Sequence, residues 1–275
     1  MSFSCEIEIN DDTVVRRPRA DGGIFPVYDL ELQTRVINAL DKVPTPRPAT
    51  FADGAMTMPF VSGAIPNDFT PLDPWLQSLP DDAARRRVWE STIDVVGAIH
   101  HEPLVEGLRV GLAAELDYWD EYVGWMGDAP AALRDAFAWC RSHAPLSNEP
   151  NAVLLWGDVR FGNIVYDEQT LAPKAVLDWD MVSAGPREMD IAWLTALDEV
   201  GRAITGLSVP GFGSRQETLR RFGRTLSDFD WYEIFAMVRA SAISTRIALL
   251  SDKPMFKPGE DPTLQAAMQR IENLG

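Results

Sequence analysis

The sequence of 275 residues is 46% hydrophobic and 24% charged, a composition typical of a water-soluble protein with one large domain or two modest ones. Its formal charge of −16 argues against nucleic acids and anionic membranes as partners, and no apolar stretch approaches the ~20 residues that a membrane span requires. The sequence has only two cysteines and three histidines, so we expect neither a disulfide framework nor a cluster of soft metal ligands. It shows no signal-peptide pattern, and we expect a cytoplasmic protein.

The first part of the chain predicts a small sheet with one helix. Residues 5–10 alternate polar and apolar side chains, and a turn leads into a second strand at 13–17, so the two form a hairpin. Residues 28–40 place their apolar side chains on one helical stripe. Residues 55–61 predict an edge strand that contains a proline.

The rest of the chain is predicted to be mainly helical. The expected helices span residues 81–101, 112–126, 131–143, 191–199, 214–226, 229–250 and 262–273. The helix at 112–126 carries carboxylates beside aromatic rings, which fits a wall of a substrate site or, as we favour, a packing face. The loop at 201–213 could flank a substrate cleft, and the aromatic residues of 229–235 predict core.

Three short apolar runs in the middle of the chain predict further strands, at residues 153–156, 164–166 and 175–177. The first and the third are each followed by an aspartate, Asp158 and Asp178. A polar loop bounded by glycines joins the first run to the second, so it can turn its side chains towards the ends of the strands.

Asp158, Asn163 and Asp178 are therefore expected to face one point. Magnesium takes hard oxygen ligands from protein, phosphate and water, so Asn163 and Asp178 beside a nucleotide would be sufficient. Asp158 is then free to accept the proton of an attacking hydroxyl, while Arg160 supplies a cation near the transferred phosphoryl group. The alternatives are a chance Asp-x4-Asn spacing and an ordinary surface arginine. Asp180 is either a second metal ligand or, as we favour, a solvated carboxylate.

The segments WGDVRFGN, at residues 156–163, and LDWDMVSAGPREMDIAW, at 177–193, resemble the catalytic half of the aminoglycoside phosphotransferase family, which is related to the protein kinases. They are also similar to uncharacterised phosphotransferases that resemble the kinase-like domains fused to acyl-CoA dehydrogenases. The resemblance implies the same base and metal ligands and adds Asp190 as a brace for the catalytic loop. Trp156 departs from the usual histidine, a change that we expect to be tolerated.

The same resemblance implies a nucleotide site in the first part of the chain. Arg16 or Arg17 stands where a family strand carries the cation that reaches the phosphates of ATP, although lysine is usual there and its ammonium is not equivalent to a guanidinium. Gln33 stands where a helix carries the acid that pairs with this cation, so a hydrogen bond would replace the ion pair. The strand at 55–61 resembles the hinge between lobes, with Phe60 or Val61 as the contact for the base.

The implied architecture is a two-lobed, protein-kinase-like α+β fold with ATP and magnesium between the lobes. We expect residues 1–61 to form an N-terminal sheet lobe with the hinge, and 62–275 a mainly helical C-terminal lobe with the catalytic and metal-binding loops. About four residues precede the first strand, so we expect the first strand and phosphate-covering loop of a complete kinase fold to be missing.

The implied function is ATP-dependent phosphorylation of a hydroxyl group on a small molecule. The alternative is a nucleotide-binding protein with impaired catalysis, because the phosphate-covering loop is expected to be missing and because Gln33 and the arginine depart from the family pattern. The acceptor can be an aminoglycoside, a hydroxyacyl thioester or another alcohol; the acidic surface suits a cation, although solubility is the explanation that we favour for it. The sequence leaves open the choice of ATP or GTP and the oligomeric state.

Overall fold

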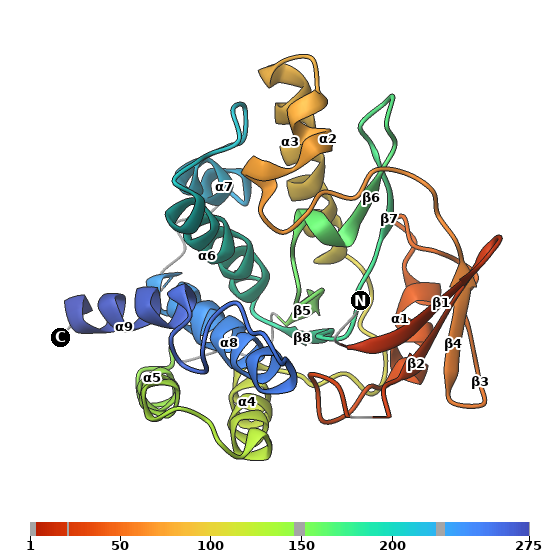
Figure 1. The fold of residues 1–275 in the computed structure, drawn as a ribbon. Coiled ribbons are helices and arrows are strands. Elements are labelled where there is room, and N and C mark those ends of the chain that lie inside the picture. The colour runs from red at the N-terminus through yellow and green to blue at the C-terminus, as the bar shows by residue number, and fades with distance from the viewer. Residues whose placement is uncertain (1–3, 21, 146–151, 224–228, 275) are drawn as a thin grey trace.

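The computed structural model describes residues 4–20, 22–145, 152–223 and 229–274. The first part of the chain forms a small sheet at one side of the molecule, and most helices lie at the other side (Figure 1). The sheet has the order β1-β2-β4-β3, and every neighbouring pair is antiparallel. Its elements are β1 (Cys5–Asn10), β2 (Thr13–Pro18), β3 (Thr50–Ala52) and β4 (Ala55–Pro59), with α1 (Leu30–Ala39) packed against β3 and β4.

The predicted hairpin and first helix are confirmed. The β1–β2 pairing runs from Cys5 opposite Pro18 to Asn10 opposite Thr13. Helix α1 begins after Asp29, whose carboxylate accepts the backbone N–H of Leu32 at 2.8 Å and so caps the helix.

The prediction that residues 55–61 form an edge strand is wrong. Strand β4 lies between β2 and β3, and β3 is at the edge of the sheet. Pro59 can be accommodated in an inner strand because it is the last residue of β4, opposite Thr13, so its missing N–H falls at the end of the hydrogen-bond ladder.

The helices predicted for the rest of the chain are present, with small changes at their ends. They are α3 (Asp82–Ile99), α4 (Leu112–Met126), α5 (Ala131–Ser142), α6 (Glu188–Thr205), α7 (Arg215–Arg221), α8 (Phe229–Leu250) and α9 (Pro262–Leu274). The structure adds the short α2 (Pro74–Ser78) and two 3-10 turns, η1 (Thr70–Leu72) and η3 (Phe161–Asn163). The end of the predicted helix at 214–226 lies partly outside the described residues.

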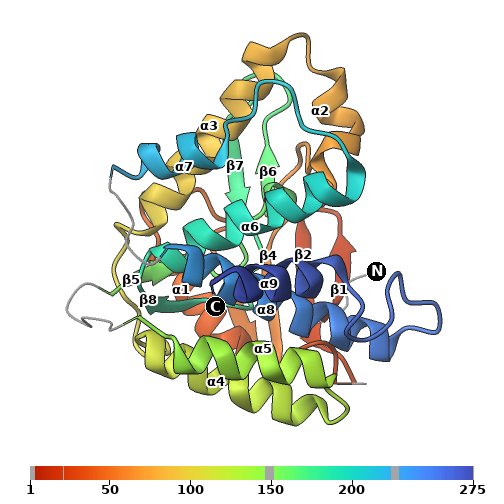
Figure 2. The ribbon, with the colours of Figure 1, turned by 90° about the vertical axis from the view of Figure 1, so that its left-hand side faces the viewer.

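Helix α8 is the centre of the helical part. It packs against α4, α5, α6 and α9, and Figure 2 shows α6 on one side of it and α4 and α5 on the other. The aromatic side chains predicted as core are all buried: Phe229, Trp231, Tyr232 and Phe235. The packing interpretation of α4 also holds, because Trp119 and Tyr122 are buried and the Tyr122 hydroxyl donates to the carbonyl of Ile24 at 2.7 Å.

Two short antiparallel sheets connect the two parts. Strand β5 (Val153–Leu155) pairs with β8 (Ser183–Gly185), and β6 (Ile164–Tyr166) pairs with β7 (Pro173–Val176). The loops that follow β5 and β7 therefore lie between the N-terminal sheet and the helices, where the sequence motifs are placed.

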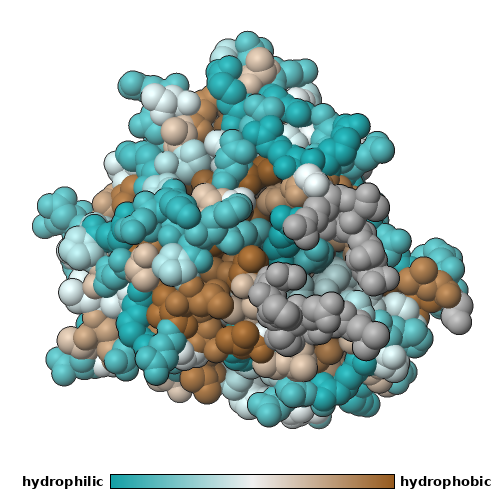
Figure 3. Space-filling model, turned by 180° about the vertical axis from the view of Figure 1, so that it is seen from behind, coloured by the Kyte–Doolittle hydropathy of each residue, from teal (hydrophilic) through white to brown (hydrophobic). Residues whose placement is uncertain are grey.

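The outer surface is mixed in character. The face seen in Figure 3 is largely hydrophilic, with an apolar patch to the left of and below its middle and smaller apolar areas elsewhere. Within the described residues, none of the helices is both long and apolar enough to cross a membrane.

Candidate active site

Asp158 follows β5 and is held by three side chains. Its Oδ1 atom accepts the indole N–H of Trp193 at 3.0 Å, and its Oδ2 atom accepts the Asn163 amide at 2.8 Å. Arg160 donates to the same Oδ2 atom from Nε at 3.1 Å and from Nη2 at 2.9 Å. These contacts fix the carboxylate in one orientation. Trp193, a buried residue of α6, is thus part of the site.

Asn163 lies at the end of η3, one turn after Asp158. Its amide nitrogen is committed to Asp158, donating to the backbone carbonyl at 3.0 Å as well as to the carboxylate. The side-chain oxygen of Asn163 therefore faces away from Asp158, and it accepts from Arg160 Nη2 at 3.4 Å. An amide oxygen in this position is a suitable ligand for a hard cation.

Asp178 follows β7 and its loop is tied to the catalytic loop. The backbone N–H of Leu177 donates to the Asn163 carbonyl at 2.8 Å. The backbone φ of Asp178 is +57°, an uncommon value for a residue with a side chain. Burial raises the pKa of Asp178 to about 6, the charge of Asp180 acts in the same direction, and Arg16 and Arg160 act in the opposite one.

The donor set is sparse for a metal held by protein alone. Within the described residues, no group of three or more His, Cys, Asp and Glu side chains is placed to hold a metal ion. Asn163 and Asp178 line the same cavity, and one carboxylate with one amide oxygen fits magnesium when phosphate and water supply the other ligands.

Asp190, in the first turn of α6, braces the catalytic loop as the resemblance implied. Its two carboxylate oxygens accept the backbone N–H groups of Gly157 at 2.9 Å and Trp156 at 3.0 Å. His100, at the C-terminal end of α3, also lies against Asp190, with Nε2 at 3.0 Å from Oδ2. Gly157 has φ +90°, and a Cβ atom there would lie 2.3 Å from the Met181 carbonyl oxygen, so the position requires glycine.

Trp156, which stands in the position of the usual histidine, supports the catalytic loop through its indole N–H. Its indole N–H lies between two backbone carbonyls of the neighbouring loop, at 2.9 Å from Leu177 and 3.1 Å from Asp178. The side chain is fully buried. The tryptophan therefore connects the loop of the proposed base to the loop of the proposed metal ligand.

Arg16 points into the molecule from β2, whereas Arg17 pairs with Glu8 on the surface. The Nη2 atom of Arg16 donates to both carboxylate oxygens of Asp180, at 3.0 and 2.9 Å, and its Nη1 atom donates to the Gln33 side-chain oxygen at 3.1 Å. The Gln33 amide donates to Asp180 at 2.7 Å. The interpretation of Asp180 as a solvated carboxylate is therefore wrong, because its side chain is 4% exposed within an ion pair.

A cavity of about 300 Å³ lies between the N-terminal sheet and these loops. Its walls include Arg16, Asn163 and Asp178 together with apolar side chains of β2 and β4, and residues 59–61 border it. The N–H of Phe60 donates to the Asp12 carbonyl at 2.8 Å, so this amide already has a partner. Phe60 and Val61 both line the cavity and stay the predicted contacts for the base.

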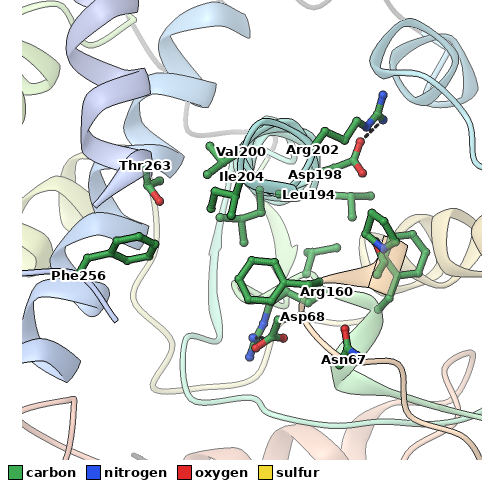
Figure 4. A pocket seen from close by; sticks show the side chains of 18 residues that line it. Asn67, Asp68, Arg160, Leu194, Asp198, Val200, Arg202, Ile204, Phe256 and Thr263 are labelled. Atoms are coloured by element: carbon green, nitrogen blue, oxygen red, sulfur yellow. Dashed lines mark hydrogen bonds and ion pairs between the residues drawn. The ribbon is translucent and has the colours of Figure 1, made fainter. Parts of the chain in front are cut away.

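A second cavity of about 530 Å³, which we call the acceptor cleft, opens on the other side of the catalytic loop. Asp158 and Arg160 line it, and Asp178 borders both this cleft and the first cavity. A third cavity of about 250 Å³ adjoins the cleft and shares Asp68, Arg160, Leu197 and Phe256 with it (Figure 4).

A family model described as a phosphotransferase enzyme family matches residues 7–227, which is most of the chain. The chain belongs to this phosphotransferase family. The family that the motifs resembled is thereby confirmed, and the matched region contains every predicted site residue from Arg16 to Asp178.

Solved structures of the family share the fold. A putative aminoglycoside phosphotransferase of Ralstonia eutropha superposes with a TM-score of 0.70 at 19% identity, over 99% of this chain and 94% of that one. An aminoglycoside phosphotransferase of Streptomyces rimosus gives 0.59 at 19%, over 88% and 93%, and its structure with ADP and streptomycin is also known. A choline/ethanolamine kinase family protein of Mesorhizobium loti gives 0.60 at 14%, over 99% and 86%. The two-lobed, kinase-like α+β fold is therefore confirmed.

The phosphotransferase fold brings most of the predicted site residues together. Asp158, Arg160 and Asn163 are in direct contact. Asp178 lines the first cavity together with Asn163, and it lines the acceptor cleft together with Asp158 and Arg160. Arg16 and Gln33 are joined, as the sequence suggested. No sequence signal pointed to Asp68, which lies 92 positions before Arg160 in the sequence. Its Oδ1 atom accepts from Arg160 Nη1 at 2.6 Å.

Proposed function

We propose that this phosphotransferase transfers the terminal phosphoryl group of ATP to a hydroxyl group of a small molecule. The observation that carries the proposal is the position of Asp158, an oriented carboxylate in the acceptor cleft, next to Asp178, which borders both cavities. An acceptor in the cleft and a nucleotide in the first cavity would meet at these two side chains.

The nucleotide would occupy the cavity of about 300 Å³. Apolar side chains of β2 and β4 suit a base, the Val61 backbone suits its polar edge, and Arg16 suits its phosphates. The Streptomyces rimosus phosphotransferase binds ADP, and a structure of an aminoglycoside 2'-phosphotransferase contains GDP, so nucleotide donors occur on this fold.

Magnesium fits the oxygen atoms of Asn163 and Asp178, which would hold it with the phosphates. When bound, magnesium supplies positive charge that offsets the negative charge of the phosphates. Asp178 is suited to this role because a nearby cation would relieve the cost of its buried charge.

Asp158 would act as the general base. The acceptor oxygen forms a bond to the terminal phosphorus, the bond from this phosphorus to the bridging oxygen breaks, ADP leaves, and Asp158 takes the hydroxyl proton. Trp193, Asn163 and Arg160 keep the carboxylate directed at the cleft. Arg160 lines the cleft and contacts Asp158, so its guanidinium would lie beside the transferred phosphoryl group. This position favours a catalytic role for Arg160 over that of an ordinary surface arginine.

The test is the substitution Asp158→Asn. We expect ADP release in the presence of an acceptor to fall by about 10²- to 10⁴-fold, while the Kd of Mg-ATP, measured by isothermal titration, changes by less than about twofold. The matched control is Asp167→Asn, which removes an exposed carboxylate that caps its own turn. Turnover that survives in Asp158→Asn would contradict the proposed base. Nucleotide binding without turnover in the unaltered protein, across a broad panel of alcohols, would favour the catalytically impaired alternative.

A further inference from the structure

The carboxylates that line the acceptor cleft already have partners. Asp158 is held by Arg160 and two further donors, and Asp68 accepts from Arg160 at 2.6 Å. Asp180 is bound on both oxygens by Arg16. Asp178 borders the nucleotide cavity and is assigned to the metal. Three of the four carboxylates among the described residues that line the cleft therefore accept from an arginine, and the fourth, Asp178, is assigned to the metal.

The wall facing these carboxylates is apolar and comes from α8. Ala240, Ile243, Ser244 and Ile247 recur at intervals of three and four residues, so they lie on one face of the helix. Helix α8 has apolar residues on all sides because α4, α5, α6 and α9 cover it, yet this stripe faces an open cavity. An apolar helix face that borders a cavity is suited to cover the hydrocarbon part of a ligand.

The remaining walls have the same character. Phe25, Met181, Trp193, Leu197 and Phe256 line the cleft from four other segments of the chain. The third cavity continues this surface: Figure 4 shows Phe256 and Thr263 on one side of it and Arg160 and Leu194 on the other. An extended apolar ligand with one end at Asp158 therefore has room along α8 or past Phe256.

We infer that the acceptor is an uncharged alcohol with an apolar body, and that the cleft discriminates against polycationic aminoglycosides. This inference rests on the proposed function, which assigns the cleft to the acceptor. The formal charge of −16 does not oppose it, because this number counts the whole chain, whereas three of the four carboxylates in the cleft accept from an arginine.

A homologous series of alcohols tests the inference directly. With saturating Mg-ATP, ADP release is measured against butan-1-ol, hexan-1-ol, octan-1-ol and streptomycin. We expect kcat/KM to rise about tenfold for every two methylene groups, from the transfer of hydrocarbon out of water, and streptomycin to give no release above the blank. A kcat/KM for streptomycin equal to that for octan-1-ol, or no dependence on chain length, would overturn the inference and leave the phosphotransferase function intact.

Two substitutions in α8 test whether the dependence of kcat/KM on chain length arises in the acceptor cleft. Ile247→Ser removes hydrocarbon from the cleft, and Leu249→Ser makes the same kind of change at a position of α8 outside the residues that line it. We expect Ile247→Ser to lower kcat/KM for octan-1-ol about tenfold with the KM for ATP unchanged, and Leu249→Ser to leave both within about twofold. Equal effects of the two substitutions would contradict the assignment of the cleft.

Direct binding separates this inference from the proposed function. If no alcohol is phosphorylated, octan-1-ol and streptomycin are titrated into the protein saturated with a non-hydrolysable ATP analogue. Binding of octan-1-ol that is weakened by Ile247→Ser and unchanged by Leu249→Ser supports the apolar cleft although the proposed transfer fails. Binding of streptomycin alone, or of neither probe, overturns the inference.

Discussion

Arg16 and Asp180 form a buried ion pair at 2.9 Å across 164 positions of sequence. The side chains are 7% and 4% exposed. Gln33 donates to Asp180 and accepts from Arg16, so the position that would carry the helix acid contributes only hydrogen bonds. The negative charge that pairs with Arg16 therefore comes from Asp180, in the loop of the proposed metal ligand, and not from helix α1. Asp180 supplies the negative charge beside Arg16 that Gln33 lacks.

The first prediction concerns this exchange of acids. Asp180→Asn should destabilise the protein by about 3 kcal/mol because it leaves the Arg16 charge buried and unpaired. Gln33→Glu alone should also destabilise, because it places a second carboxylate against Asp180. The double variant should be more stable than either single one, since a carboxylate at position 33 restores one charge pair with Arg16; chemical denaturation measures all four proteins.

The exposed pair of Arg17 and Glu8 is the control for this cycle. Glu8→Gln should change the free energy of unfolding by less than about 1 kcal/mol. A double variant no more stable than Asp180→Asn would show that Gln33 and Asp180 are not interchangeable partners of Arg16.

The second prediction concerns Asp178 and pH. Its pKa is raised from 3.8 to about 6 in the folded protein, so the folded state binds the proton more tightly than the unfolded state does. This proton contributes stability below about pH 4, and the contribution is lost as the pH rises to about 6. Without metal or nucleotide, Asp178→Asn should therefore raise the Tm at pH 7 by at least ~2 °C, with a smaller gain at pH 4.

Two results check the sign of this effect. Hydrogen bonds from Thr170 lower the pKa of Asp167, so Asp167→Asn should show no gain in Tm as the pH rises. Addition of Mg-ATP should reverse the order, stabilising the unaltered protein more than Asp178→Asn. A gain in Tm that stays constant from about pH 4 to pH 7 would mean that the Asp178 carboxyl is not the group responsible.

The third prediction concerns Gly157. A side chain at this position meets the Met181 carbonyl and must adopt φ +90°, so Gly157→Ala should destabilise the protein by about 2 kcal/mol or more and displace Asp158. Gly97→Ala, in the open interior of α3, should instead stabilise by about 0.5–1 kcal/mol. Thermal unfolding and turnover are measured for both; a harmless Gly157→Ala would refute the steric argument.

The fourth prediction concerns Trp156 as a positioning residue. Trp156→Phe keeps a large ring but removes the indole N–H from the Leu177 and Asp178 carbonyls, so the magnesium concentration for half-maximal activity should rise about tenfold. The control is Trp231→Phe, which removes a similar bond to Cys140 far from the site. Both should lose about 1 kcal/mol of stability. An equal magnesium dependence in the two variants would assign Trp156 a structural role only.

The sequence by itself determined the local elements and the centre of the site. The periodicity of apolar residues located most helices to within a few residues, because helix formation depends on neighbours three and four positions away. Asp158, Arg160 and Asn163 were predictable as a group since a short loop keeps them close whatever the rest of the chain does. The lobe boundary at residue 61 stays a prediction.

Only the tertiary structure decided which distant groups meet. Asp180 was misjudged, and the contacts of His100 with Asp190 and of Asp68 with Arg160 were missed, because each partner lies far away in the sequence. The apolar acceptor cleft was equally hidden. Helix α8 is apolar on every side, so its sequence does not distinguish the face that packs on neighbouring helices from the face that borders the cleft. That distinction arises from how separate helices pack, which no local pattern of side chains encodes.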